Sequence, residues 1–580
     1  MLLLLASFAA LGIGPALVVI ARSRPWALDA ADGFAVVAIL GITLFHVLPE
    51  AFATGGPWAA LAMIAGIVAP LLLETKGHAT NDHPTRHARF APALALAGLA
   101  VHGLVDGVAL AGDARAIGIA IVLHRIPEGV AAWTISRPAF GARWTLAALG
   151  GLALATSFGV LAGKAGLPLA GGMGPAIVQA VAMGSVLHVV LHHAPRNATW
   201  THHHDHVLAS SDQHPHPAHP ATPGHSAGLH VASALGAAAG AVAVAVLPLE
   251  SGNGATGART TFVRLAAASA PWLLAAVVAA GFLAGISART FERVATRSGR
   301  VLAVVRAVLM APLLPVCSCG VRPLYERMIE RKAHAVAALA VLVSAACLGP
   351  ATILLSLGLL GWQLTLARCA GALLIATFAG LGATRSQGEG TPSLPPAAPM
   401  HLRWRLGPAL ETVDYTGAWL IAGLACAAVI APLATRIAGA PGALVVGGLA
   451  LAGLPGYVSA AGATPFAAVL IESGVSPGAA LAFVLTGPCA NIDTIRLVAR
   501  RHGLRASAWF AGSATCLAVA AGLAYDALVP ASPPANSAAA GGLVSVIALV
   551  IVSGLLTISV VRHGPRHLLS QLVSQVAREY

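Results

Sequence analysis

The sequence predicts an all-α, polytopic transmembrane protein with about sixteen to eighteen spans, counted at roughly 20 residues each. Of its 580 residues, 57% are hydrophobic and only 9% are charged, whereas a soluble domain carries about a quarter charged residues. Apolar runs long enough to cross a bilayer also recur along the whole chain. The clear runs are 2–21, 34–54, 58–75, 91–112, 172–193, 231–248, 270–287, 416–433 and 540–561.

The charge distribution predicts the topology. The formal net charge is +13, from 34 Lys+Arg against 21 Asp+Glu. The basic residues lie in short loops, as the positive-inside rule describes for cytoplasmic loops, so we expect a lipid bilayer and no nucleic acid as partner. The bias between alternate loops predicts an N-terminus outside and His-rich loops in the cytoplasm. The expected location is a bacterial cytoplasmic (inner) membrane.

Two modules are expected. Residues 1–250 hold eight spans and a hydrophilic, His-rich loop at 194–230. Residues 260–562 form a second module with two repeats, at about 260–384 and 405–530, followed by a final helix.

The repeat is visible in the letters of the sequence. A shift of 142 residues aligns Cys317–Ile353 with Ser459–Ile495 without a gap, and it brings Cys347 onto Cys489. Secondary transporters often have duplicated halves and hold their substrate where the halves meet. The pattern therefore favours a transporter, and no enzyme activity is expected.

Three spans of the first module carry a histidine and a carboxylate four residues apart. The pairs are His46 with Glu50, His102 with Asp106, and His124 with Glu128. This spacing puts both groups on one helix face, and the combination suits zinc and related metals. Ionisable groups inside a bilayer are costly and usually mark an ion path. His102, Asp106, His124 and Glu128 would complete a four-ligand site if their two spans pack side by side.

These motifs resemble the ZIP (Zrt/Irt-like protein) family of metal transporters. The resemblance covers about residues 1–250 and rests on the three His/carboxylate pairs, the eight spans and the outside N-terminus. It implies movement of zinc, iron or a related divalent cation toward the cytoplasm. It also implies that the transport ligands are His102, Asp106, His124 and Glu128.

The chain departs from that family at two positions. Many bacterial members have Asn or Asp directly after the first ligand of these two spans, where this chain has Gly103 and Arg125. A guanidinium would take the place of a second cation, since it stays charged. We therefore expect one metal, with an altered metal preference or a non-transporting module as open alternatives.

Further histidines follow in this module. His188 lies in the seventh expected span, and it is either a pathway ligand or a packed side chain. The loop after it is His-dense, and such tracts bind metal loosely, which favours a metal buffer or sensor over a segment without a role. The candidate residues of this loop are His202, His203, His204 and His206.

The second module carries a cysteine motif. Cys317 and Cys319 are flanked by Pro315 and Gly320, which suggests a broken helix with two thiols that suit a soft metal or metalloid. An inert thiol pair is the alternative. Cys347 and Cys489 occupy equivalent repeat positions, and we expect them to face each other.

Residues 260–530 resemble the predicted-permease family that includes organoarsenical efflux permeases. The resemblance rests on the segments 315–320, 344–350 and 486–491. It implies a two-repeat transporter, with efflux of trivalent arsenicals in some members. Arg322 stands where a small or apolar residue is expected, so the substrate stays open as a metal, a metalloid or another small solute.

Two other functions remain as alternatives, an intramembrane zinc-dependent hydrolase and a membrane thiol-redox carrier. The chain lacks the His-Glu-x-x-His string of metalloproteases, and no Cys-x-x-Cys is present. It also lacks a phosphate-binding loop, so transport would be driven by a gradient. No tightly bound cofactor is expected, Zn²⁺ or a related divalent cation is the expected substrate, and a homo-oligomer is left open.

Overall fold

The computed structural model of the chain is all-helical, and no strand occurs in the residues that it describes. The described ranges are 2–21, 24–79, 87–111, 115–165, 172–192, 225–246, 252–283, 300–314, 318–330, 335–383, 405–455, 458–529 and 542–577. The predicted fold class is therefore confirmed. The chain forms two compact units, of which the first comprises 1–260, 557–573 and 579–580 and the second comprises 261–556 and 574–578.

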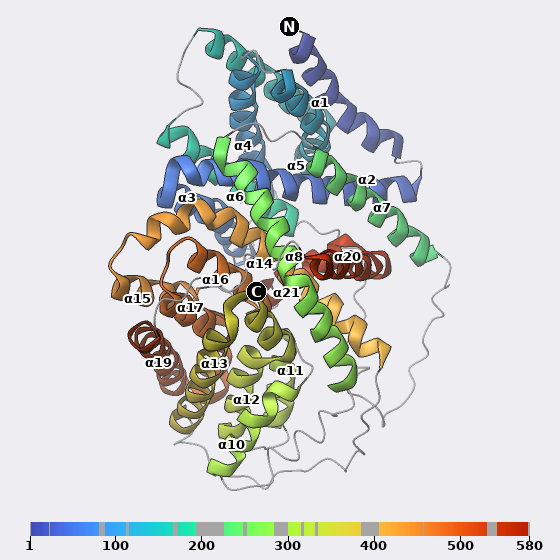
Figure 1. The fold of residues 1–580 in the computed structure, drawn as a ribbon. Coiled ribbons are helices and arrows are strands. Elements are labelled where there is room, and N and C mark those ends of the chain that lie inside the picture. The colour runs from blue at the N-terminus through green and yellow to red at the C-terminus, as the bar shows by residue number, and fades with distance from the viewer. Residues whose placement is uncertain are drawn as a thin grey trace. The chain divides into compact units, whose positions relative to one another are not determined.

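Besides the first part of α8 (Gly252–Leu283) and the last part of α20 (Leu543–His563), the described residues of the first unit form seven long helices and a π-helical segment. They are α1 (Leu2–Ala21), α2 (Pro25–Ile42), η1 (Thr43–Val47), α3 (Leu48–Ala79), α4 (His87–Leu110), α5 (Arg115–Lys164), α6 (Met173–His192) and α7 (His225–Val246). Helix α21 (Pro565–Ala577) also lies largely in this unit. Helices α2 and α7 lie side by side, as do α4 and α5 (Figure 1).

Helix α5 folds back on itself at Gly141. This glycine has φ 78° and ψ 168°, a conformation open essentially to glycine alone. Arg125 and Thr156 would lie about 46 Å apart along a straight helix. Their side chains are instead hydrogen-bonded at 2.9 Å, so the two parts of α5 run next to each other.

Backbone contact fixes α4 against the second part of α5. A Cβ added at Gly107 would lie 2.2 Å from the carbonyl oxygen of Thr156, and one added at Gly159 would lie 2.1 Å from that of Leu104. Small residues allow such close approach between membrane helices. The contact holds Asp106, one residue before Gly107, near Thr156.

The π-helical segment η1 coincides with the first His/carboxylate pair. The backbone N–H of Leu48 bonds to the carbonyl of Thr43, five residues back. The next residue is Pro49, which has no N–H to continue the α-helical pattern. Single π turns are often found at functional sites, and this one contains His46.

The second unit contains eleven helical elements among its described residues, besides the last part of α8 (Gly252–Leu283) and the first part of α20 (Leu543–His563). They are α10 (Arg300–Met310), η3 (Ala311–Leu313), α11 (Ser318–Glu330), α12 (Ala335–Leu348), α13 (Pro350–Ala383), α14 (Leu406–Ala438), α15 (Gly442–Ala452), α16 (Ala460–Glu472), α17 (Pro477–Cys489), α18 (Ile492–His502) and α19 (Leu504–Leu528).

The internal repeat is present in the structure. Under the shift of 142 residues, the first residues of α10, α11, α12 and α13 fall on the first residues of α15, α16, α17 and α18. Gly361, which breaks α13, falls on Gly503, which separates α18 from α19. Their φ angles are 83° and 87°. The two copies therefore share both their helix boundaries and their backbone break.

Helices α12 and α17 form the centre of the second unit. Thirteen residues of α12 and twelve residues of α17 are buried, as expected for helices that are apolar on every face. Each is shorter than the roughly 20 residues that cross a bilayer. They therefore serve as half-helices inside the unit, packed against each other and against α13 and α16.

Among the described residues, 8 helices are long and apolar enough to cross a membrane, or up to 9 if the bent pair α17 and α18 counts as one span. The expected sixteen to eighteen spans are more numerous for two reasons. Helices α3, α5 and α13 each contain two apolar stretches, separated by a break at Gly56, Gly141 or Gly361, and each helix is counted once. Other apolar helices, such as α12, are too short to qualify.

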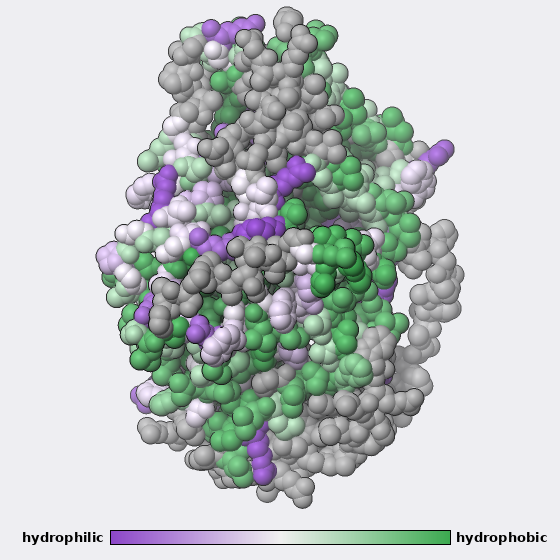
Figure 2. Space-filling view, in the orientation of Figure 1, coloured by the Kyte–Doolittle hydropathy of each residue, from purple (hydrophilic) through white to green (hydrophobic). Residues whose placement is uncertain are grey.

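The surface is that of an integral membrane protein. Large apolar side chains are exposed on several helices, including Trp144, Leu154 and Leu543 at 72%, 71% and 74%. Figure 2 shows hydrophobic residues over much of the visible described surface. Such an extent of apolar exposure marks contact with lipid or with a partner.

We expect Gly503→Ala to destabilise the protein by about 1–3 kcal/mol, because alanine is strained at this positive φ. No atom lies within 4 Å of the added Cβ, so the effect comes from the backbone alone. Thermal unfolding in detergent measures it. Gly512→Ala is the matched control, since that glycine is helical and its added Cβ also meets no atom. Equal unfolding midpoints for the two variants would contradict the role given to the break.

Candidate functional site

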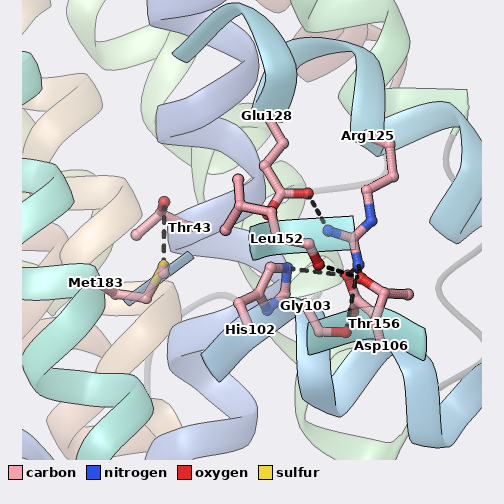
Figure 3. A network of polar contacts seen from close by, with 9 residues as sticks. All are labelled: Thr43, His102, Gly103, Asp106, Arg125, Glu128, Leu152, Thr156 and Met183. Atoms are coloured by element: carbon pink, nitrogen blue, oxygen red, sulfur yellow. Dashed lines mark hydrogen bonds and ion pairs between the residues drawn. The ribbon is translucent and has the colours of Figure 1, made fainter. Parts of the chain in front are cut away.

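A buried polar cluster lies between α4 and the two parts of α5 in the first unit (Figure 3). His102, Asp106, Arg125 and Glu128 are each exposed by 6% or less. The His102 Nε2 and Asp106 Oδ2 atoms are 3.6 Å apart, as the four-residue spacing predicts. The structure thus brings together three of the predicted ligands and the arginine.

Arg125 is the cation of this cluster. Its guanidinium lies 3.1 Å from Asp106 Oδ2 and donates a hydrogen bond of 2.8 Å to Glu128 Oε2. It also donates to Thr156 Oγ1 at 2.9 Å and to the carbonyl of Gly103 at 3.4 Å. One guanidinium therefore compensates the charge of two buried carboxylates. A carboxylate without such a partner would be strongly unfavourable in the bilayer.

Gly103 makes room for this arrangement. A Cβ at this position would lie 3.2 Å from both Arg125 Nη1 and Thr156 Oγ1. The two departures from the ZIP pattern, Gly103 and Arg125, therefore lie in direct contact. The smaller residue accommodates the larger one.

The Glu128 carboxylate pairs with Arg125 through only one of its two oxygens, Oε2. Its Oε1 atom is buried and has no hydrogen-bond partner among the described residues. A buried acceptor without a partner is costly, so this oxygen is the place in the cluster where a proton or a cation would be held.

The remaining predicted metal ligands are distributed as follows. His46 is half-buried in η1 and Glu50 is exposed in α3. His124 and His188 belong to α5 and α6, but their side chains lie outside the described part of the structure. The described residues contain no group of three or more His, Cys, Asp or Glu side chains that could hold a metal ion. The four-ligand site thus stays a prediction.

The predicted ligands of the His-rich loop lie outside the described residues. They are His202, His203, His204 and His206.

A second cluster lies in the second unit, where α12, α13, α16 and α17 pack together. Cys347 and Cys489 are fully buried at the ends of α12 and α17. Both thiols approach the carbonyl oxygen of Leu485, at 3.8 and 2.8 Å. The structure thus brings together equivalent residues of the two repeats.

Two further cysteines are predicted ligands, Cys317 and Cys319. Cys317 lies outside the described residues, and Cys319 belongs to the first turn of α11 with its side chain outside the described part. A binding role for these two thiols stays a prediction.

Arg368 is the residue of this cluster that the sequence analysis missed. It is 1% exposed and donates to Ser356 Oγ at 2.8 Å, to Thr464 Oγ1 at 2.9 Å and to the carbonyl of Ala460 at 3.5 Å. Ser356 and Arg368 lie on opposite sides of the Gly361 break in α13, and the bend at this break brings their side chains together. An arginine inside the apolar stretch 350–383 was the available signal, because an intramembrane charge indicates a functional site.

The two clusters suit different chemistry. In the first unit an internal cation already compensates the carboxylates, and Glu128 Oε1 is a buried oxygen without a hydrogen-bond partner among the described residues that could accept a further proton or cation. In the second unit, two thiols and a guanidinium combine a soft ligand set with positive charge.

Arg125→Met should destabilise the first unit by about 3–5 kcal/mol, because it leaves Asp106 and Glu128 buried without their cation. Thermal unfolding in detergent tests this. Arg143→Met is the control, since Arg143 is exposed on the same helix and surface substitutions change stability by about 0.5 kcal/mol or less. A loss no larger than that of the control would show that Arg125 does not hold the carboxylates.

Comparison with known proteins identifies the second half only. Residues 255–390 and 400–527 match a family described as a predicted permease. No curated protein and no solved structure matches the chain. The match does not extend to residues 1–254, so the ZIP resemblance of that part stays a prediction. The second half of the chain, over residues 255–527, is therefore similar to this family of predicted permeases.

Proposed function

We propose that the protein is a transporter fused from two modules, and that its permease half moves a small solute past the point where its two repeats meet. One observation carries this proposal. Cys347 and Cys489, at equivalent positions of the two repeats, both approach the carbonyl oxygen of Leu485. The repeat interface is where secondary transporters bind substrate.

The broken helices around this point support the proposal. Helices α17 and α18 are bent by 47° at a short break, and Cys489 is the last residue before it. Irregular backbone at membrane depth is tolerated where it is buried in protein or lines a pathway. Asn491 stabilises the break by accepting a hydrogen bond from the backbone of Thr494.

The thiols favour a thiophilic substrate, such as a soft metal or a trivalent metalloid. Cys317 and Cys319 are further candidates for contact with it. A thiol-redox carrier is the alternative that a close cysteine pair also allows.

We expect the double variant Cys347→Ala, Cys489→Ala to slow uptake of phenylarsine oxide into everted membrane vesicles by about tenfold, the loss of roughly 1.4 kcal/mol of binding. Cys516→Ala is the control, because that thiol is free and exposed on α19. Unchanged uptake in the double variant would remove the thiols from the pathway. Reduction of an added disulfide by the wild type, without uptake, would support the redox carrier instead.

The first unit carries a second candidate function, transport of a divalent cation such as zinc. The specific observation in its favour is Glu128 Oε1, buried beside the His102–Asp106 pair without a partner among the described residues. For zinc to bind between the carboxylates, Arg125 would have to leave at least one of them. This requirement weakens the proposal relative to the permease.

Zinc uptake into proteoliposomes tests the second candidate. Glu128→Ala should lower uptake by roughly tenfold or more, as removal of a metal-site group does. Glu326→Ala, which changes a partly exposed carboxylate of the second unit, should leave it unchanged. Absence of zinc uptake by the wild type would mean that the first unit does not carry this metal.

A further inference from the structure

Arg368 differs in its partners from two other arginines of the described residues, Arg125 and Arg264. Arg125 is paired with Asp106 and Glu128, and Arg264 is paired with Glu472. Arg368 is 1% exposed, yet its partners among the described residues are two hydroxyls and one carbonyl, all neutral. An isolated buried charge is strongly unfavourable, so this site calls for a negative charge.

The guanidinium also has donors to spare. It carries five N–H groups, and three hydrogen bonds engage Nη1 twice and Nη2 once. The Nε atom is buried and has no partner among the described residues. The Nε–H and an Nη2–H lie along one edge of the guanidinium, the fork that binds the two oxygens of a carboxylate or another oxyanion.

A helix terminus adds positive potential at the same place. Helix α16 begins at Ala460, and Arg368 contacts its first turn through Ala460 and Thr464. The N-terminus of a helix carries a partial positive charge and favours anions. The guanidinium and the partial positive charge of the helix terminus lie close together, which is unfavourable. A bound anion would offset both of these charges.

The nearest candidates for an internal negative charge are thiols. Cys347, Cys369 and Cys489 interact electrostatically with Arg368, but none of them accepts a hydrogen bond from it. A thiolate at Cys347 is therefore the competing explanation, and the experiment below separates it from a bound anion.

We propose that Arg368 binds the negatively charged group of a small anionic substrate, a carboxylate or another oxyanion, at the junction of the two repeats. This deepens the proposed permease function and rests on it. Arg368 belongs to the first repeat and Thr464 to the second, so one site joins both copies. The repeat equivalent of Arg368 is Phe510, which is fully buried, so the second repeat carries no arginine at this position.

The test is thermal unfolding of the full chain in detergent with phosphate, sulfate or acetate, each compared with chloride at equal ionic strength to remove general screening. We expect at least one of the three anions to raise the midpoint of the wild type. Arg368→Met should abolish this rise. In chloride it should raise the midpoint by about 2 °C or more, because it removes an uncompensated charge.

Two further variants sharpen the result. Arg368→Lys keeps the charge but loses the two-pronged fork, so its half-saturating anion concentration should increase about tenfold. This variant decides the question if Arg368→Met does not fold. Arg264→Met is the matched control, because Arg264 bonds Glu472 at the opposite end of α16. It should keep the full anion response.

Three outcomes would overturn the proposal. One is the absence of any anion response in the wild type. Another is a response that persists in Arg368→Met. The third is a response that appears only when Cys347 and Cys489 are both replaced by Ala, which would identify a thiolate as the counter-charge. Thermal unfolding reports anion binding and does not depend on transport. Failure of the arsenical uptake experiment would therefore overturn the permease proposal without changing the result for anion binding.

Discussion

Compensation of buried charge is the constraint on which both clusters depend. The hydrocarbon of a bilayer supplies no hydrogen bonds, so each charge and each broken helix has to find its partners inside the protein. In the first unit Arg125 meets this need for two carboxylates. In the second unit Arg368 meets only neutral groups among the described residues. A buried arginine is thus paired with carboxylates in the first cluster, whereas in the second cluster we propose that a bound anion supplies the counter-charge.

Much of the fold could be predicted from the sequence. Long apolar runs and scarce charges indicate membrane helices regardless of detail, and the 142-residue repeat reappears in the first residues of four helix pairs. The number of spans was harder to predict, because it depends on single backbone torsions. A glycine such as Gly141 folds a helix back without any polar loop, and half-helices such as α17 are apolar yet too short to span.

The sites were predictable in part, for a related reason. The His102–Asp106 contact follows from helical spacing, and the approach of Cys347 to Cys489 follows from the repeat. Long-range contacts leave no such local pattern. The bond between Arg368 and Thr464 joins residues 96 apart, and only the tertiary packing of α13 on α16 creates it. The sequence predicts that Arg125 replaces a second cation, and this stays a prediction, whereas its contacts with both Asp106 and Glu128 are found only in the structure.

The backbone contact between α4 and the second part of α5 has a consequence for motion in the first unit. Gly107 and Gly159 bring the two helix backbones into close contact. We expect the two helices to move together, so that His102, Asp106 and Thr156 keep their mutual positions in a rearrangement. The first part of α5 joins this pair at the Gly141 hinge and carries Arg125 and Glu128. Opening and closing of the cluster would then be a single swing about Gly141, which moves the cation and one carboxylate away from the other.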